Sequence, residues 1–322
     1  MGLCVGHESS LRYWLTKTGD EALPEHATPG AFRQAEATSA LVKEGTLPFG
    51  PEPGRPLHLV VSDPALKHRI RDCQVHVYEG FLPDGSFRRL PGTNLIASPE
   101  LTFLELAQTH SPWELVEAGN YLCSTFSIGD EGRGYTGKRT QVTTMEQLSR
   151  FLDEVPSHTR GVRRARQALE HVVELTASPK ESQLAMHYHL PVELGGRGPF
   201  EITANQEIRI DEHGQRLLSS GHLVGDLFLP DFDCDLEFDS IEFHTGRFRL
   251  DHTQARRNVL EAMGIKTVSA TEGQINRIEK LDDFTWLLEE RLGIPHPTYT
   301  REQRLAQIDL FDWLNDPQRT LF

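Results

Sequence analysis

The sequence predicts an α/β protein in which a C-terminal mixed sheet flanked by helices follows a separate α+β domain. The C-terminal half alternates in the order helix, three strands, helix, strand, helix, which is typical of a compact unit around one sheet. The 322 residues are enough for two modest domains, each with its own core. We expect domains at 1–157 and 158–294, the second beginning with a linker helix, and a helical tail at 295–322.

The N-terminal domain combines helical and strand patterns. Ser98-Pro99-Glu100 predicts a helix start, with Ser as the N-cap, Pro at the first helical position and Glu in the first turn. Thr143 and Thr144 open a further predicted helix that ends at Val155. The remaining expected elements are helices around 9–15, 31–44 and 161–175, and strands over 57–62, 73–79 and 94–97.

The C-terminal half begins with Ser178-Pro179-Lys180-Glu181, which repeats the same kind of helix start. Strands are then predicted over 206–210 and 223–229, followed by an acidic strand over 233–239. A helix over 253–263 ends at Gly264. The remaining expected elements are a β-branched strand at 265–269 and amphipathic helices at 280–292 and 301–314.

The charge of the chain argues against a simple nucleic-acid-binding protein. The formal net charge is −14, whereas DNA-binding proteins usually show a basic footprint. One basic patch runs against this average, formed by Arg160, Arg163, Arg164 and Arg166. It is either the solvated face of a helix or a set of phosphate contacts.

The cysteines and the N-terminal residues predict the cellular compartment of the protein. Four cysteines, Cys4, Cys73, Cys123 and Cys234, are scattered without close pairs, which predicts neither a disulfide framework nor a zinc knuckle. The first residues lack the apolar core of a signal peptide, and we find no apolar run of membrane-spanning length. We therefore expect a protein of the reducing cytoplasm with no membrane partner.

The acidic strand poses an electrostatic problem. From Asp233 to Asp239, acids alternate with apolar residues. A strand here places Cys234, Leu236 and Phe238 on one face and four carboxylates on the other. Acidic residues are depleted from strands, and like charges on one face repel each other. The row of carboxylates therefore needs a partner that compensates its negative charge.

A hairpin supplies one explanation. Residues 230–233 can form a four-residue loop, and pairing Leu229 with Cys234 then sets Asp226 opposite Glu237. Directly opposed residues have Cβ atoms roughly 4.5–5.5 Å apart, and Asp239 follows on the same face. Carboxylate oxygens suit Mg²⁺, which would turn the repulsion into binding. The alternative is a wet hairpin whose acids face water and are screened.

Two other motifs have weaker support. Gly132 to Lys138 matches the skeleton of a phosphate-binding loop, but Arg139 stands where the Mg²⁺-binding Ser or Thr is required. We expect a flexible basic loop there. His187 and His189 would form a metal pair on one face of a strand, but no Cys or carboxylate lies nearby at ligand spacing.

The acidic motif as a whole has a family likeness. Asp226, ten residues, Glu237-Phe238-Asp239, four residues and His244 resemble the core of the PD-(D/E)XK nuclease superfamily, nearest the Vsr-like (very-short-patch-repair) branch. In that branch an aromatic-His pair follows the acids, as Phe243-His244 does here, and Glu181 matches its upstream helix Glu. The likeness implies a restriction-endonuclease-like fold for the C-terminal domain.

A second likeness covers the residues before this domain. The runs 161–169 and 178–182, together with Arg71 to His76 and the helix start at Ser98, are similar to actinobacterial proteins of the AbiEi antitoxin type. The N-terminal domain then corresponds to the middle domain of those proteins. Many of them carry a winged-helix DNA-binding head, which we do not expect here because the chain begins almost at the middle domain.

The resemblance implies a Mg²⁺-dependent (or Mn²⁺-dependent) DNA endonuclease or a derivative of one, in a defence or toxin–antitoxin setting. The metal ligands that it implies are Asp226, Glu237 and Asp239. Glu181 would complete the acidic shell, and His244 would act as general acid/base or bind the phosphate.

Basic residues would then contact the DNA backbone. The implied phosphate contacts are Lys180, Arg160, Arg163, Arg164 and Arg166. The alternative function is a non-catalytic DNA-binding regulator or antitoxin that uses the nuclease fold as a binding module, with a cognate toxin protein as a further partner.

Overall fold

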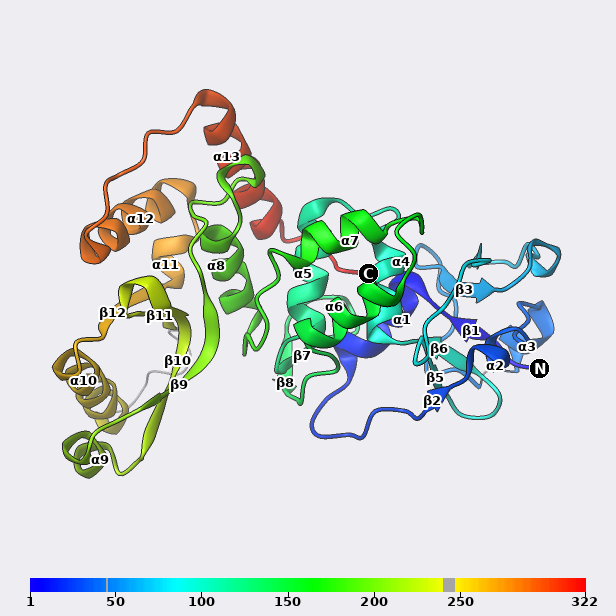
Figure 1. The fold of residues 1–322 in the computed structure, drawn as a ribbon, viewed down its shortest axis with the longest axis horizontal. Helices are drawn as coiled ribbons and strands as arrows, with labels where there is room; N and C mark the ends of the chain where they lie inside the picture. The colour runs from blue at the N-terminus through cyan, green and yellow to red at the C-terminus, as the bar shows by residue number, and fades with distance from the viewer. Residues whose placement is uncertain (45, 240–246) are drawn as a thin grey trace. The chain divides into compact units, whose positions relative to one another are not determined.

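The computed structural model describes residues 1–44, 46–239 and 247–322 (Figure 1). Unit 1 comprises Met1–Val172 and Thr320–Phe322, and unit 2 comprises Val173–Arg319. The division thus falls later than the predicted boundary after residue 157, because helix α7 (Val162–Leu169) packs on α5 (Pro112–Leu122) and α6 (Met145–Glu154) of unit 1.

The predicted tail is not a separate segment. Helix α13 (Arg301–Asn315) belongs to unit 2, where it packs against the short helix η2 (Val192–Leu194) and against α8 (Pro179–His189). Its buried residues include Leu310 and Phe311. The apolar stripe of this helix therefore adds to the core of unit 2.

Unit 1 is built on a mixed six-stranded sheet in the order β2-β5-β6-β1-β3-β4. Strand β1 runs parallel to β6 and antiparallel to β3, and β3 runs parallel to β4. The strands are β1 (Cys4–Val5), β2 (His26–Ala27), β3 (Leu57–Val61), β4 (Cys73–Val77), β5 (Phe87–Arg89) and β6 (Leu95–Ala97). The three strands predicted in this region are confirmed as β3, β4 and β6.

The longer helices of unit 1 pack on one another, and α1 (His7–Thr16) and α4 (Pro99–Leu106) also contact the sheet. Strands β7 and β8 form a separate two-stranded hairpin. Besides α1, α4, α5, α6 and α7, the other elements of unit 1 are α2 (Pro29–Phe32), α3 (Ser39–Lys43), η1 (Pro64–Leu66), β7 (Phe126–Ile128) and β8 (Tyr135–Lys138).

Helix starts follow the capping residues in the sequence. The Ser98 hydroxyl accepts a hydrogen bond from the Leu101 amide at 3.2 Å and begins α4. Thr144 caps α6 in the same way. Ser178 caps α8, accepting from the Glu181 amide at 3.2 Å. Each of these starts is predicted from the sequence, because a hydroxyl before a helix satisfies a backbone N–H that has no partner in the helix.

Unit 2 has the predicted order of helix, three strands, helix, strand and helix. Its sheet order is β12-β11-β10-β9, with β9, β10 and β11 antiparallel and β12 parallel to β11. After α8, the elements are β9 (Thr203–Arg209), α9 (Glu212–Leu218), β10 (His222–Leu229), η3 (Pro230–Phe232), β11 (Cys234–Asp239), α10 (Arg247–Ala262), β12 (Lys266–Thr271), α11 (Glu272–Ile275) and α12 (Ile278–Leu292). A short helix, α9, stands where the sequence predicts only a turn.

The two faces of the unit 2 sheet differ. Leu227, Leu236 and Leu288 belong to a buried core with side chains of α8, α12 and α13. Figure 1 shows α8, α11 and α12 on one side of these strands and α10 on the other. The alternate residues of β11, Asp235 and Glu237, contact Arg256 of α10. The predicted alternation is thus confirmed for Asp235 and Glu237, whereas Asp233, expected on the same face, lies in the turn before β11.

Two expectations about the whole chain concern membranes and disulfides. Within the described residues, no helix combines the length and apolarity needed to cross a bilayer. All four cysteines are free thiols, so none of them forms a disulfide.

Candidate acidic site on the C-terminal sheet

The hairpin between β10 and β11 has the predicted register. Leu229 pairs with Cys234 and Leu227 with Leu236 across the two strands. The turn between them contains Asp233 in the left-handed region at φ 46°. Beyond Leu227, the Asp226 carboxyl accepts a hydrogen bond from the Phe238 amide at 2.9 Å. Asp226 is therefore fixed against the backbone of the strand that carries the other acids.

The pKa values of Asp226 and Glu237 respond to the acids around them, including Asp239. Burial raises the pKa of Asp226, and the charge of Asp239 raises it further, whereas the Phe238 amide and Arg256 oppose the shift. Burial also raises the pKa of Glu237; Arg256 opposes this, and both Asp226 and Asp239 add to it. A raised pKa means that the negative form is under-compensated. The three acids thus form one electrostatic cluster.

Arg256 is a cation within this cluster. Its Nη2 lies 2.9 Å from Glu237 Oε1 and 3.3 Å from Asp235 Oδ2. It also donates to the Val224 carbonyl at 2.6 Å. The Asp235 side chain is fully buried, and burial, with the Glu237 charge added, raises its pKa to about 7. One guanidinium therefore partly neutralises two buried carboxyls.

Asp235 also depends on a glycine beside it. A Cβ added at Gly225 would lie 2.6 Å from Asp235 Oδ1, which is too close for any real side chain. The absence of a side chain at Gly225 is thus what lets β10 approach the buried carboxyl.

A second arginine extends the cluster toward β12. Arg257 Nη2 donates to the Ser269 hydroxyl at 2.8 Å, and this hydroxyl lies 3.4 Å from Glu237 Oε2. Sequence reasoning missed both arginines as site residues. The available signal was the adjacent pair in the helix that follows the acidic strand.

The cluster has the donor chemistry of a magnesium site. Among the side chains that the structure describes, no three or more His, Cys, Asp or Glu are arranged as a ready-made metal cage. Mg²⁺, however, is commonly bound by one or two carboxylates and several waters. Arg256 opposes the pKa rise of Asp226, Asp235 and Glu237, and Arg257 opposes that of Glu237, whereas the charge of Asp239 adds to the rise of Asp226 and Glu237, so four carboxyls and two guanidiniums share this region. Full ionisation leaves an excess of two negative charges, which one divalent cation would balance.

Of the two remaining predicted site residues, Glu181 lies within the described part of the chain and His244 does not. Glu181 is buried at the start of α8, where Oε2 accepts from the Ala177 amide and Oε1 from the Ser178 hydroxyl, each at 2.8 Å. These contacts give it a capping role. His244 and the neighbouring Phe243 lie outside the described residues.

The two other motifs are structural. His187 and His189 lie in α8, not on a strand, so the predicted shared strand face is wrong. His187 is buried, which lowers its pKa to about 3, and His189 bonds the Phe200 carbonyl at 2.6 Å. The segment ending at Lys138 forms β8, paired with β7, instead of the expected flexible loop.

The basic patch belongs to unit 1. Arg164 donates to the His110 carbonyl and Arg166 to the Leu152 carbonyl, so both help to attach α7 to unit 1. Arg160 and Arg163 are exposed. Lys180 lies in the first turn of α8 in unit 2.

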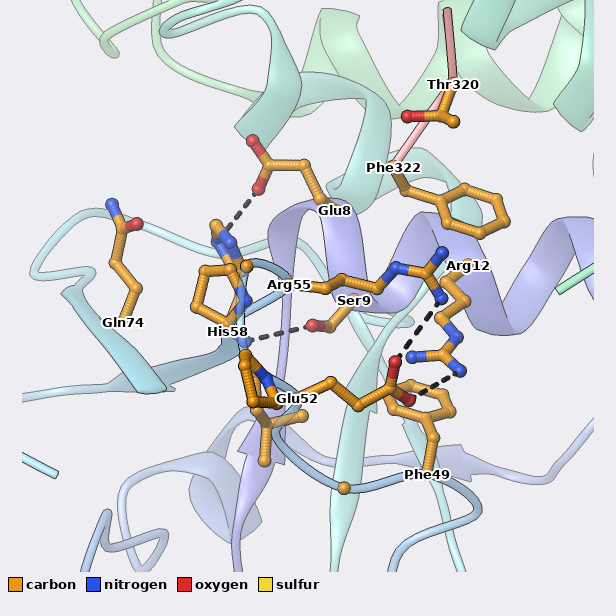
Figure 2. Close-up of a pocket in the computed structure, with 15 residues that line it drawn as sticks. Glu8, Ser9, Arg12, Phe49, Glu52, Arg55, His58, Gln74, Thr320 and Phe322 are labelled. Carbon is orange, nitrogen blue, oxygen red and sulfur yellow. Dashed lines mark hydrogen bonds and ion pairs between the residues drawn. The ribbon is translucent and has the colours of Figure 1, made fainter. Parts of the chain in front are cut away.

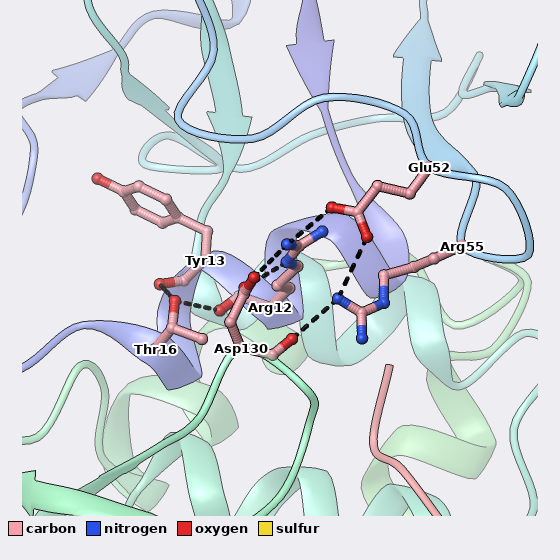
Figure 3. A network of polar contacts seen from close by, with 6 residues as sticks. All are labelled: Arg12, Tyr13, Thr16, Glu52, Arg55 and Asp130. Carbon is pink, nitrogen blue, oxygen red and sulfur yellow. Dashed lines mark hydrogen bonds and ion pairs between the residues drawn. The ribbon is translucent and has the colours of Figure 1, made fainter.

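A separate cavity of about 650 Å³ lies in unit 1. Figure 2 shows Glu8 and Arg12 from α1 together with His58 and Arg55 around it. Arg12 Nε donates to Asp130 at 2.6 Å, and Nη2 lies 3.2 Å from Glu52. Arg55 donates to the Asp130 carbonyl at 2.9 Å (Figure 3). Because Arg12 and Arg55 already have acidic or carbonyl partners, this network connects loops of unit 1 and does not select a charged ligand.

Histidines form a cluster beside this cavity. His58 Nδ1 lies 2.8 Å from Glu8 Oε2 and 3.0 Å from His76 Nε2. His7 stacks on His76 at 3.6 Å. Burial lowers the pKa of His7 to about 3 and that of His76 to about 4. His7 and His76 are therefore neutral at physiological pH.

No protein family model, curated protein or solved structure matches the chain. A function for this chain therefore has to follow from its own geometry and chemistry.

Proposed function

We propose that unit 2 is a Mg²⁺- or Mn²⁺-dependent DNA endonuclease domain of the PD-(D/E)XK type, near the Vsr-like branch, or a derivative of one that acts in the cytoplasm. The observation that carries the proposal is the cluster of Asp226, Glu237 and Asp239 on adjacent strands, in which the Asp226 carboxyl accepts from the Phe238 amide and the charges of Asp226 and Asp239 add to the raised pKa of Glu237. The succession of α8, β10, β11, α10 and β12 adds support, because the resemblance places a helix with Glu, a strand with Asp, a strand with the acid pair, a helix and a strand in that order.

In this proposal Asp226 and Glu237 hold the cation, and Asp239 shares ligation or orients a water. The bound ion would supply charge stabilisation at the scissile phosphate and a more acidic water. The chain supplies positioning: the Phe238 amide fixes Asp226, and the Ser269 hydroxyl lies beside the second oxygen of Glu237. Such pre-orientation is what a metal-binding carboxylate requires from its neighbours.

The remaining residues take supporting roles in the proposal. His244 serves as general acid/base or binds the phosphate. Glu181 would complete the acidic shell, and its capping contacts fix the start of α8, where Lys180 lies. The exposed Arg160 and Arg163 are the members of the basic patch best suited to DNA phosphates, since Arg164 and Arg166 already bond backbone carbonyls.

One observation favours a second candidate, a non-catalytic DNA-binding regulator or antitoxin with a cognate toxin as partner. The guanidinium of Arg256 pairs with both Asp235 and Glu237. This guanidinium can neutralise the acids in place of a metal ion, as expected of a nuclease fold that binds DNA without cleaving it.

Incubation of the full chain with linear DNA, supercoiled DNA and RNA in Mg²⁺ or Mn²⁺ separates the two candidates. We expect divalent-dependent cleavage that is lost with EDTA and in Asp226→Asn. The matched control is Glu207→Gln, which removes an exposed acid from the neighbouring strand β9 and should cleave normally. If every substrate stays uncut and calorimetry detects no divalent binding, the nuclease proposal fails. Sequence-specific DNA binding without cleavage would then favour the regulator.

A further inference from the structure

A cavity lies against the outer edge of the unit 2 sheet. Strand β12 is the edge strand, with β11 as its partner on one side. The cavity has a volume of about 580 Å³, within the range of roughly 300–1,000 Å³ that is common for ligand sites. Its walls come from α10, β12 and α12, including Arg257, Ser269, Trp286, Leu287 and Arg291.

This cavity adjoins the acidic cluster. Ser269 lines the cavity, and its hydroxyl contacts both Arg257, at 2.8 Å, and Glu237, at 3.4 Å. A single side chain therefore separates the cavity from a proposed metal ligand. The cavity wall and the acidic cluster thus share the Ser269 side chain.

Trp286 is an unusual wall residue. Its exposed fraction is 55%, although Leu281 and Leu288 of the same helix are fully buried. The His296 ring stacks on the indole at 5.4 Å and 16°. Glu289 and Glu290 hold that imidazole at 2.6 and 2.8 Å. The indole is thus oriented by a ring partner and not by the core, and most of its surface stays available.

The polar groups of the cavity differ in how fully they are satisfied. Arg291 pairs with Glu261 at 3.2 Å, and Glu290 with His296. Arg257 has no ion pair among the described residues, and its buried Nε lacks a hydrogen-bond partner there. The buried hydroxyl of Thr267 likewise has no partner in that part of the chain. The cavity therefore combines a fixed, exposed aromatic ring with Arg257, whose charge acts on Glu237 but which makes no direct ion pair within the described part of the chain.

We propose that this cavity binds one unpaired nucleotide of a single-stranded nucleic acid, with the base stacked on Trp286 and the phosphate at Arg257. The choice of ligand rests on the proposed nuclease function, and it narrows the substrate to single strands or to strands with an extruded base. Aromatic stacking accepts every base, because each base has a π-face, and arginine suits phosphate. An extended peptide that adds to the edge of β12 is the competing class of ligand.

Fluorescence anisotropy of labelled oligo-dT, oligo-rU and duplex DNA tests this proposal. The titrations use the full chain in EDTA, so that cleavage does not interfere, and the two oligonucleotides distinguish DNA from RNA. Trp286→Ala should weaken single-strand binding by roughly 5- to 100-fold, the effect of losing one stacked base. Trp286→Phe should restore most of it. Arg257→Gln should lower the dependence of log affinity on log salt by about one unit.

Leu305→Ala is the matched control, because Leu305 is a comparably exposed apolar residue, on α13 and not in the cavity wall. It should bind as the wild type does. Equal binding by Trp286→Ala and wild type, tighter binding of duplex than of single strands, or no nucleic-acid binding at all would overturn the proposal. Capture of an extended peptide that depends on Trp286, with no response to nucleic acid, would also overturn it.

The two proposals can fail separately. Divalent-dependent cleavage that is unchanged in Trp286→Ala would remove only the nucleotide site. Binding of single strands in EDTA that depends on Trp286, without cleavage in Mg²⁺ or Mn²⁺, would remove only the nuclease function.

Discussion

Replacing Arg256 by Leu should destabilise unit 2 in a strongly pH-dependent way. The guanidinium contacts Glu237 at 2.9 Å, Asp235 at 3.3 Å and the Val224 carbonyl at 2.6 Å. Leu fills much of the same space but leaves the fully buried Asp235 without its cation. Removing one partner of a buried ion pair typically costs about 3–5 kcal/mol of the free energy of unfolding.

The direction of the pH dependence follows from the raised pKa of Asp235, about 7 in the folded chain against an ordinary 3.8. In the wild type, folding retains a proton on this carboxyl, so the stability it contributes is lost as the pH rises from about 4 to about 7. Without Arg256 the folded pKa rises further, and the loss continues above pH 7. We expect a deficit of about 1 kcal/mol at pH 5, from the hydrogen bond to Val224, and about 3–5 kcal/mol at pH 9.

Urea unfolding at pH 5, 7 and 9 measures this difference. Arg150→Leu is the control, because Arg150 forms an exposed pair with Glu146 that should contribute less than about 0.5 kcal/mol at any pH. Under the metal account, Mg²⁺ should return part of the lost stability at pH 9, since a ligand that binds only the folded state stabilises it. A deficit of the same size at pH 5 and pH 9 would refute the reasoning.

Two further changes test individual contacts. Burial raises the pKa of Glu105 from 4.5 to about 8, so the stability that this carboxyl contributes falls as the pH rises between these values. Glu105→Gln should therefore raise the free energy of unfolding by about 3 kcal/mol at pH 7 and hardly at pH 4.5, as measured by urea unfolding. A gain that does not grow with pH would contradict this. Gly225→Ala should cost about 1–3 kcal/mol by crowding Asp235, whereas Gly221→Ala, which has open space at its Cβ, should stay within about 0.5 kcal/mol. Equal thermal melts for these two glycine variants would contradict the crowding.

Much of the fold of unit 2 could be predicted because its signals are local. The Ser178 cap, the period-2 alternation of β11 and the turn at 230–233 each depend on a few adjacent residues. Together they fix the hairpin register, since one slip would exchange the apolar and acidic faces. The division between the units, after Val172, differs from the predicted boundary for the opposite reason. Helix α7 joins unit 1 by packing on α5, which lies well before it in the chain, as well as on the neighbouring α6.

The candidate site was only partly predictable. Alternation placed the acids of β11 on one face, and the turn brought Asp226 beside them. Arg256 and Arg257 approach from another element, and helical periodicity alone does not reveal which strand face they reach. The two histidines of α8 were assigned to a strand because a short run of apolar and polar residues suits either element. The histidine cluster of unit 1 was missed because its members are far apart in the sequence.

The central claim, that Asp226 and Glu237 together hold a divalent cation, is tested most directly by titrating the full chain with Mn²⁺ and counting bound ions by calorimetry and electron paramagnetic resonance. The account predicts one Mn²⁺ per chain, competition by Mg²⁺, and loss of binding in Asp226→Asn but not in Glu207→Gln. A chain that binds no Mn²⁺, or one whose binding is the same in Asp226→Asn, would contradict it.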